Sequence, residues 1–234
     1  MTDPDGLDEY ARAYPQLEND TIPPLVERWL AKRRFATILD AGCGEGALVR
    51  ALVKSGHVAG RLLACDGSAV RLARLADIGE PVTTFVDDVE ELRNVETGAV
   101  DFVISSQVIE HVDDARMLKT LARVTEKGGI VYLSTVQKSW YAWYFHRSEG
   151  GWALDPTHRR EYRSDDELLA LVDADDFVVR ENVKSPVRYP APDFLLRRMG
   201  RVPFVRTLTW LQRMRKVRVR IPGYFVWELV LERR

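Results

Sequence analysis

The feature that most constrains this chain is a predicted buried strand that runs directly into three alternating glycines. Residues 36–41 are mostly apolar and end just after an acid, Asp40, and apolar residues at helical spacing resume over 47–54. The glycines between them are Gly42, Gly44 and Gly46. Glycine allows a tight turn and lets a ligand approach the backbone closely. A strand, turn and helix in this order predict a nucleotide-binding loop at the edge of an α/β sheet.

A second acid strengthens this interpretation. Asp66 ends another predicted strand, residues 61–66, about 20 residues beyond the glycines. A carboxylate at that place can accept hydrogen bonds from both ribose hydroxyls of a bound nucleoside. The glycine turn alone is also typical of dinucleotide-binding proteins, so the two signals together carry more weight than either one.

These residues, with three later segments in the same order, resemble the class I S-adenosylmethionine-dependent methyltransferases. In that family an acid precedes the alternating glycines, as Asp40 does here. Residues 85–92 resemble the family's adenine-binding segment, residues 101–112 its fourth strand and following loop, and residues 127–134 its fifth strand. The resemblance spans about residues 35–136.

The resemblance implies a Rossmann-like, doubly wound α/β sheet of seven strands, mostly parallel with an antiparallel last strand and helices on both faces. A helical and aromatic insertion near the C-terminus is expected as well. The strand pattern places the seven strands near 36–41, 61–66, 82–86, 100–105, 129–136, 177–183 and 224–232. Helices are predicted over 21–32, 47–54, 68–76 and 165–173. One domain is expected over residues 1–234: an N-terminal helical segment (1–34), the cofactor-binding core (35–136) and acceptor-side lids or insertions (137–163 and 186–221).

The implied cofactor is S-adenosylmethionine, and the resemblance assigns residues to its parts. Asp40 would support the ammonium group, Asp66 would hold the ribose, and Asp88 would accept from the adenine amine while Val89 offers its backbone N–H. The remaining implied cofactor contacts are Gly42, Cys43, Gly44, Gly46, Gly67, Ser105 and Gln107. Each acid has a structural alternative: Asp40 can bond amides of its own turn, and acids at strand ends also cap helices or face water. Asp87 is the neighbour most easily exchanged with Asp88.

Methyl transfer to a hydroxyl requires a base, and histidine suits that role near neutral pH. Four histidines are present: His57, His111, His146 and His158. His158 lies in a segment, 155–162, that resembles the histidine-containing segment of small-molecule methyltransferases, and His111 follows the fourth predicted strand. Both are candidate catalytic residues, with the fixing of a loop as the alternative for His111. His57 is predicted to be a solvated loop residue.

The predicted function is O-methylation of a small apolar or lipid-linked acceptor, of the phenol or quinone-precursor type. An aromatic stretch over 139–146, with Trp152, is expected to wall the acceptor pocket or to pack as a lid. Non-catalytic cofactor binding, as in a scaffold protein, is an alternative from a different class.

The charge of the chain is nearly balanced overall, at 34 basic and 35 acidic residues, but nine cations and no acid lie within residues 194–220. An amphipathic segment there, 203–216, predicts either an interfacial helix on an anionic membrane or a lid helix with solvated arginines. The cations also suit an RNA methyltransferase. That alternative is less favoured, because no RNA-binding module is recognisable and the loop after the fourth strand reads Ser-Ser-Gln-Val.

The expected location is cytoplasmic, with peripheral association at the inner membrane face. No apolar run approaches the roughly 20 residues of a membrane span, and the first residues lack a basic-then-apolar signal. Cys43 and Cys65 are expected to be reduced packing residues, and no metal site is predicted. The oligomeric state is left open.

Overall fold

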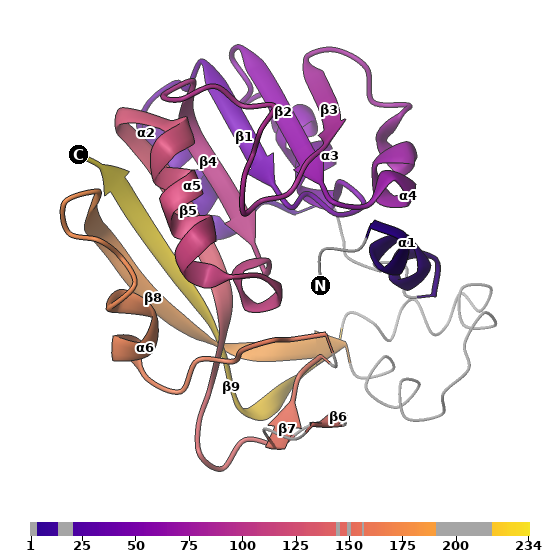
Figure 1. Cartoon of the computed structure of the whole chain (residues 1–234), viewed down its shortest axis with the longest axis vertical. Helices are drawn as coiled ribbons and strands as arrows, with labels where there is room; N and C mark the ends of the chain where they lie inside the picture. Colours follow the sequence, from indigo (N-terminus) through magenta and orange to yellow (C-terminus); the bar gives the residue numbers. More distant parts are fainter. Residues whose placement is uncertain (1–3, 14–20, 144–145, 149–150, 156, 191–216) are drawn as a thin grey trace.

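A single seven-stranded sheet organises the structure, with helices on both of its faces (Figure 1). The structure is a computed structural model that describes residues 4–13, 21–143, 146–148, 151–155, 157–190 and 217–234. The strand order is β3-β2-β1-β4-β5-β9-β8. Strands β1 to β5 pair in parallel, and β9 pairs antiparallel with both β5 and β8. The predicted fold class, including the antiparallel last strand, is confirmed.

All seven strands lie where the sequence predicts them. Their bounds are β1 Thr37–Ala41, β2 Arg61–Asp66, β3 Val82–Val86, β4 Val100–Ser106, β5 Thr125–Lys138, β8 Phe177–Pro190 and β9 Arg218–Arg233. A separate two-stranded sheet, β6 (His146–Ser148) with β7 (Gly151–Ala153), lies within the predicted acceptor-side segment.

The helices begin and end at recognisable signals. They are α1 Pro4–Ala13, α2 Pro24–Lys32, α3 Ala47–Ser55, α4 Ala69–Leu72, α5 Asp114–Val124 and α6 Asp165–Leu169, with the 3₁₀ turns η1 Ala73–Leu75 and η2 Ile109–His111. Proline occupies the first turn of α2, whose predicted start is Thr21. The side chains of Ser68 and Asp113 accept backbone N–H groups at the starts of α4 and α5. The predicted helix over 68–76 is divided between α4 and η1, and that over 165–173 ends at Leu169.

The sheet is buried on both faces, which explains the continuous apolar strands. On β1, Leu39 faces a core that includes Leu121 of α5, while Ile38 faces a second core that includes Leu30 of α2 and Leu52 of α3. Alternate residues of a strand point to opposite faces, so adjacent apolar positions supply both cores. The cores hold the strand ends, and therefore the ligand edge, in fixed positions.

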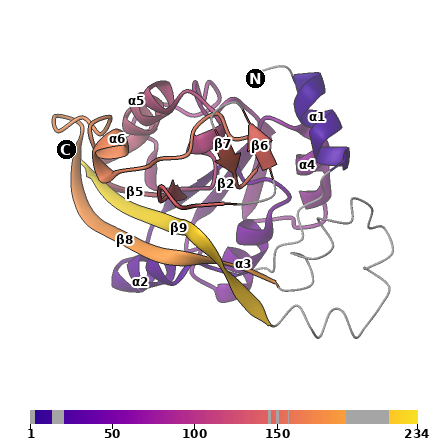
Figure 2. The same cartoon turned by 90° about the horizontal axis from the view of Figure 1, so that it is seen from below.

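Three strands are longer than predicted. β5 runs to Lys138, β8 to Pro190, and β9 begins at Arg218. Figures 1 and 2 show β8 and β9 as a curved ribbon that extends beyond the rest of the sheet, with β6 and β7 beside it. A small third core, which includes Val136, Leu154, Val187, Ile221 and Tyr224, joins this extension to the segment after β5. The two ends of the expected 186–221 insertion are thus strand, and residues 191–216 lie outside the described residues.

Gly46→Ala is expected to unfold the protein at lower denaturant than Gly56→Ala. Both glycines have left-handed backbone, with φ of 78° and 71°. A Cβ at Gly46 would lie 2.0 Å from Leu75 Cδ2, whereas no atom of the described residues lies within 4 Å of one at Gly56. Backbone strain alone costs about 1–2 kcal/mol, and overpacking against the buried Leu75 adds about 1–3 kcal/mol. Urea unfolding of the two variants measures the difference, and equal midpoints would contradict the argument.

Candidate functional site

The candidate site lies at the carboxyl ends of β1, β2 and β4 (Figure 1). Chain order reverses between β1 and β4, which are neighbours in the sheet but not in sequence. In open α/β sheets this is the place where ligands bind. The glycine turn, Asp66 and the residues after β4 all meet there.

Backbone hydrogen bonds shape the glycine turn. The N–H groups of Gly42 and Cys43 both donate to the carbonyl of Cys65, at 2.9 and 2.8 Å. Gly42 has φ of 81°, and a Cβ there would lie 2.5 Å from Val108 Cγ2. The loop after β4 therefore packs directly on the turn, which only glycine permits. Cys43 and Cys65 are buried free thiols, and burial raises the pKa of both, as expected of packing residues.

Asp66 fixes the turn as well as ending β2. Its Oδ2 accepts from Gly44 N–H and its Oδ1 from Ser68 N–H, both at 2.9 Å. Asp66 thus holds the glycine turn, whereas the two alternatives predicted for it do not apply: Ser68 caps α4, and Asp66 is buried. Each carboxylate oxygen offers about two lone pairs, so two acceptor positions remain for ribose hydroxyls. Binding of a ribose at Asp66 stays a prediction, compatible with its bonds to the turn.

Helix α1 covers the neighbouring part of the site. The Asp8 carboxylate accepts from the Ser68 hydroxyl at 2.6 Å and from Val70 N–H at 3.2 Å. A Cβ at Gly67 would lie 2.9 Å from Leu7 Cδ1, so glycine is needed there for the approach of α1. Sequence reasoning missed Asp8, whose partners lie far from it along the chain.

The acids after β3 have different tasks. Asp87 is buried and accepts from the backbone N–H groups of Asp88, Arg93 and Asn94, which uses both of its oxygens to hold the loop. Asp88 is half-buried, and its Oδ1 accepts from Glu90 N–H at 2.9 Å. Since Asp87 is committed to its own loop, Asp88 is the better candidate for the adenine amine, with the buried Val89 beside it.

Asp40 is buried at the site, and one of its carboxylate oxygens lacks a hydrogen-bond donor among the described residues. The residue is 2% exposed, and its Oδ2 has no hydrogen-bond partner among the described residues. Burial, with the nearby charge of Asp66, raises the pKa of Asp40 from 3.8 to about 7. A buried carboxylate oxygen without a donor is costly, and an ammonium group would satisfy it. The chemistry of this acid therefore fits the methionine end of S-adenosylmethionine.

The two polar residues after β4 differ in position. The Ser105 hydroxyl donates to the carbonyl of Ala41 at 2.9 Å, and the side chain is fully buried. This bond connects β4 to the last residue of β1, directly before the glycine turn. Gln107 is half-buried with φ of 57°, a strained value for a residue with a side chain, and its N–H donates to Ser134. Direct cofactor contact stays a prediction for both.

The structure brings His111 and His158 together from distant parts of the chain. Their ring centroids lie 4.8 Å apart in an edge-on arrangement. His111 Nδ1 lies 3.3 Å from the Thr157 carbonyl and 3.1 Å from its hydroxyl. Burial, with His158 beside it, lowers the pKa of His111 to about 4, so its ring is neutral at physiological pH. The loop-fixing alternative for His111 therefore has direct support.

His158 is oriented by a buried carboxylate. Its Nδ1 lies 2.8 Å from Glu161 Oε1, and the two side chains are 6% and 3% exposed. Glu161 also accepts from Leu154 N–H at 2.6 Å and pairs with Lys138 at 3.3 Å. Burial alone would raise the pKa of Glu161, but the bonds from His158 and Leu154 and the charge of Lys138 lower it overall. An ionised Glu161 keeps the proton of His158 on Nδ1 and leaves Nε2 as the basic nitrogen.

Glu110 completes the cluster and holds the two segments together. Its backbone carbonyl accepts from Arg159 N–H and Arg160 N–H, at 2.8 and 3.2 Å. Its carboxylate is fully buried, with Oε2 accepting from Thr135 and Oε1 without a hydrogen-bond partner among the described groups. Burial raises the pKa of Glu110 to about 7.

Glu110, His111 and His158 could also hold a metal ion. One ligand atom from each lies within 4.8 Å of the other two. Neutral imidazoles and a carboxylate suit a divalent transition metal. Sequence reasoning did not find this group, because its third member is distant along the chain. The expectation that the chain has no metal site stays a prediction.

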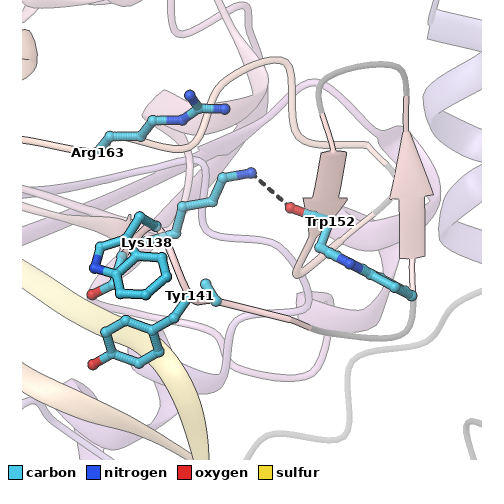
Figure 3. Close-up of a pocket in the computed structure, with 7 residues that line it drawn as sticks. Lys138, Tyr141, Trp152 and Arg163 are labelled. Atoms are coloured by element: carbon cyan, nitrogen blue, oxygen red, sulfur yellow. Dashed lines mark hydrogen bonds between the residues drawn. The ribbon is translucent and has the colours of Figure 1, made fainter.

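Beyond β5 the chain forms an aromatic and cationic wall. A cavity of about 610 Å³ is lined by Lys138, Ser139, Trp140, Tyr141, Ala142, Trp152 and Arg163. Figure 3 shows the side chains of Lys138 and Arg163 extended in the same direction, with the Lys138 ammonium bonded to the Trp152 carbonyl at 2.6 Å. Trp140 is 95% exposed, which is unusual for so large an apolar ring. The aromatics thus border a cavity and are not core residues.

Comparison with known proteins agrees with this geometry. A family profile described as a methyltransferase domain matches residues 39–133. Residues 39–133 therefore match a methyltransferase domain, which is consistent with the class I S-adenosylmethionine-dependent methyltransferases. The "Ubiquinone biosynthesis O-methyltransferase" of Sodalis glossinidius (strain morsitans) is 32% identical over 108 residues, 45% of this chain and 43% of that protein. The protein of the same name from Idiomarina loihiensis is 26% identical over 161 residues, 64% of this chain and 66% of its own. The aligned part thus spans less than two thirds of the length of these relatives.

Solved structures share the fold of this chain at low identity. One solved for work on "Conversion of a Disulfide Bond into a Thioacetal Group during Echinomycin Biosynthesis" is 17% identical, with a TM-score of 0.63 over 99% of this chain and 93% of that one. The geranyl diphosphate C-methyltransferase of Streptomyces coelicolor A3(2) is 16% identical, with a TM-score of 0.58 over 90% and 78%. The [4+2]-cyclase SpnF is 19% identical, with a TM-score of 0.61 over 89% and 80%.

The other two histidines of the chain lie apart from the cluster. His57 follows α3 in a loop, as predicted, and its backbone N–H donates to the Ser55 hydroxyl. His146 lies on β6. Sequence reasoning missed Glu161, Lys138 and the role of Glu110, because only their distant partners distinguish them from ordinary charged residues. A glutamate three positions after His158 was the one local signal available for the orienting acid.

Proposed function

We propose that this chain is an S-adenosylmethionine-dependent O-methyltransferase that acts on a small hydroxyl acceptor with an apolar or aromatic body. The observation that carries the proposal is the hydrogen bond between His158 and the buried Glu161, at the ligand edge of a methyltransferase fold. It supports a histidine base with a fixed basic nitrogen, which an oxygen acceptor needs. The relatives that bear the name O-methyltransferase favour the same reaction over RNA methylation or a scaffold role.

The residues present fit the cofactor. Asp40 offers a buried acceptor for an ammonium group, Asp66 retains acceptor positions for ribose hydroxyls, and Asp88 faces the loop that would hold adenine. When bound, S-adenosylmethionine supplies an electrophilic methyl group on a sulfonium. The task of this chain is then to place the acceptor oxygen in line with that methyl group and to remove its proton.

His158 would accept the proton at Nε2, and the imidazolium would be stabilised by Glu161. The bonds from His158 and Leu154, with the charge of Lys138, lower the pKa of Glu161 and so keep this carboxylate ionised. The fold alone does not decide the reaction, since SpnF, a [4+2]-cyclase, shares it. Turnover must therefore be measured.

Calorimetric titration of S-adenosylmethionine and S-adenosylhomocysteine tests the cofactor site. We expect micromolar binding to the wild type and at least about tenfold weaker binding to Asp88→Ala, because one hydrogen bond to adenine is lost. Asp66→Ala should abolish binding and also lower the melting temperature, since the buried N–H groups of Gly44 and Ser68 lose their acceptor. Well-folded wild type that binds neither compound would refute the proposal.

Location at a membrane is a separate proposal. The basic segment over 203–216 supports peripheral contact with anionic lipid, but it lies outside the described residues. Among the helices that the structure describes, none is long and apolar enough to cross a membrane. Co-sedimentation with anionic liposomes, lost when Arg206, Arg213 and Arg215 become alanine, is the test.

A further inference from the structure

We propose that the acceptor is an aromatic acid, whose carboxylate is bound by the cationic wall beyond β5. This inference rests on the proposed function, because it assigns a substrate class to the same site. It is carried by two adjoining cavities and by the kinds of side chain that line them.

The two cavities share part of their lining. The first, of about 610 Å³, contains Trp140, Tyr141 and Trp152. The second, of about 220 Å³, contains His158 and Arg159. Lys138 and Arg163 line both, so the cavities adjoin at these two cations. Their combined size suits a small-molecule site, which typically takes about 300–1,000 Å³.

The lining of the two cavities is strongly positive. It contains four cations, Lys138, Arg159, Arg160 and Arg163, against one carboxylate, Glu161, which is a net charge of +3. Glu161 is 3% exposed and already engaged by Lys138 and His158. Arg160 pairs with Asp114 at 2.5 Å, whereas the carboxylate that Arg159 approaches, that of Glu90, lies 3.9 Å away. A planar carboxylate is the anion that an arginine binds best, through two parallel hydrogen bonds.

The aromatic residues specify the rest of the ligand. The rings of Trp140 and Tyr141 lie 5.5 Å apart, nearly perpendicular to one another. Trp140 is 95% exposed and Trp152 41%, so both present ring surface toward the cavity and the solvent. A flat aromatic ring stacked there would bury this surface while its carboxylate meets Arg163. Figure 3 shows Tyr141, Trp152 and the two shared cations around the same cavity.

The second cavity connects the cationic and aromatic side chains to His158, the proposed base. His158 lines it, and the same side chain contacts His111 at the ligand edge. An acceptor whose hydroxyl lies at His158 would therefore extend past Lys138 and Arg163 into the first cavity. A benzoate with a hydroxyl next to its carboxylate satisfies each part: the hydroxyl lies at the base, the carboxylate at the cations between the cavities, and the ring beyond them among the aromatics.

The test compares 2,3-dihydroxybenzoate with its methyl ester, which is uncharged and nearly the same shape. Both are titrated calorimetrically into protein saturated with S-adenosylhomocysteine. We expect the acid to bind at least about tenfold more tightly than the ester at low salt, with the preference falling as salt is added. Arg163→Gln should reduce the acid to the affinity of the ester, and Arg159→Gln should reduce it less. Arg180 is an exposed arginine of β8 that pairs with Glu232. Arg180→Gln is therefore the matched control, and we expect it to leave the affinities for the acid and the ester unchanged.

The outcomes separate this inference from the proposed function. Failure of S-adenosylhomocysteine to bind would contradict the proposed function itself. If it binds, equal affinity of acid and ester for the wild type, or binding of neither, overturns the aromatic-acid assignment alone. An undiminished preference in both Arg163→Gln and Arg159→Gln would likewise overturn the assignment of the carboxylate to this wall.

Discussion

Asp40→Asn is expected to stabilise the cofactor-free protein at pH 8 while it weakens cofactor binding by at least about tenfold. At that pH the wild type buries an ionised carboxylate whose Oδ2 has no donor among the described residues. Asparagine removes this charge and keeps the side chain's shape. The same change removes the negative charge that would pair with an ammonium group, so stability and binding should move in opposite directions.

The raised pKa of Asp40 determines whether Asp40→Asn stabilises or destabilises the folded protein at a given pH. The pKa of Asp40 is raised from 3.8 to about 7 in the folded state. Between these values the folded protein binds more protons than the unfolded chain, so stability contributed by this group falls as pH rises from about 4 to about 7. Each pH unit between the two pKa values lowers the free energy of unfolding by about 1.4 kcal/mol, so ionised Asp40 costs at most about 4 kcal/mol at pH 8. We expect Asp40→Asn to raise the free energy of unfolding at that pH by about 2–4 kcal/mol.

Glu110 acts with the same sign as Asp40, and His111, whose pKa is lowered to about 4, acts with the opposite sign. Both remain in the variant, so the difference between variant and wild type isolates Asp40. Urea unfolding at pH 5 and pH 8 measures it. Asp101→Asn is the control, because Asp101 accepts from Ala36 N–H and Thr37 N–H and its loss should destabilise at both pH values. A variant less stable than wild type at pH 8 would mean that Asp40 has a partner in solution.

Glu161→Gln is expected to lower kcat by at least about 100-fold with little change in the affinity for S-adenosylmethionine. The carboxylate accepts from both His158 and Leu154 N–H. Both bonds go to the same oxygen, Oε1, so the oxygen of a glutamine could keep them, while its NH₂ group would take the place of Oε2 beside Lys138. What the variant loses is the negative charge that stabilises the imidazolium formed when His158 takes the proton of the acceptor. Loss of the orienting carboxylate costs about 10⁴ in hydrolase triads, and a general base contributes about 10²–10⁴.

Two measurements separate catalysis from binding. Single-turnover rates with an acceptor found by screening report catalysis, and calorimetric titration of S-adenosylmethionine reports binding. His158→Ala should lose as much activity as the double variant with Glu161→Gln, because the two residues act as one unit. Glu126→Gln is the matched control, since this exposed glutamate lies near the start of β5, at the other end of that strand from Lys138. A Glu161→Gln enzyme with wild-type kcat would show that His158 is not the base. Glu161→Asp should recover part of the activity and keep the pH profile.

The sequence alone was sufficient for the elements whose signals are local. Buried strands such as 37–41 and 61–66 read as apolar runs because both faces are covered, and the glycines at 42–46 mark a turn that side chains cannot adopt. The ends of β8 and β9 were not predictable, since the solvent-exposed residues of β8 lack an apolar pattern and are held by pairing with β9. The small sheet of β6 and β7 was also missed, because each of its strands is only three residues long.

What only the tertiary structure decided is which side chains meet. The sequence by itself placed Asp40, Asp66 and the acids after β3 at strand ends, because parallel strands bring their carboxyl ends to one edge. It could not divide the tasks of Asp87 and Asp88, which depend on the amides each oxygen reaches. Nor could it join His111 to His158, or Glu161 to Lys138, because hydrogen bonds and ion pairs act over a few ångströms between residues far apart along the chain.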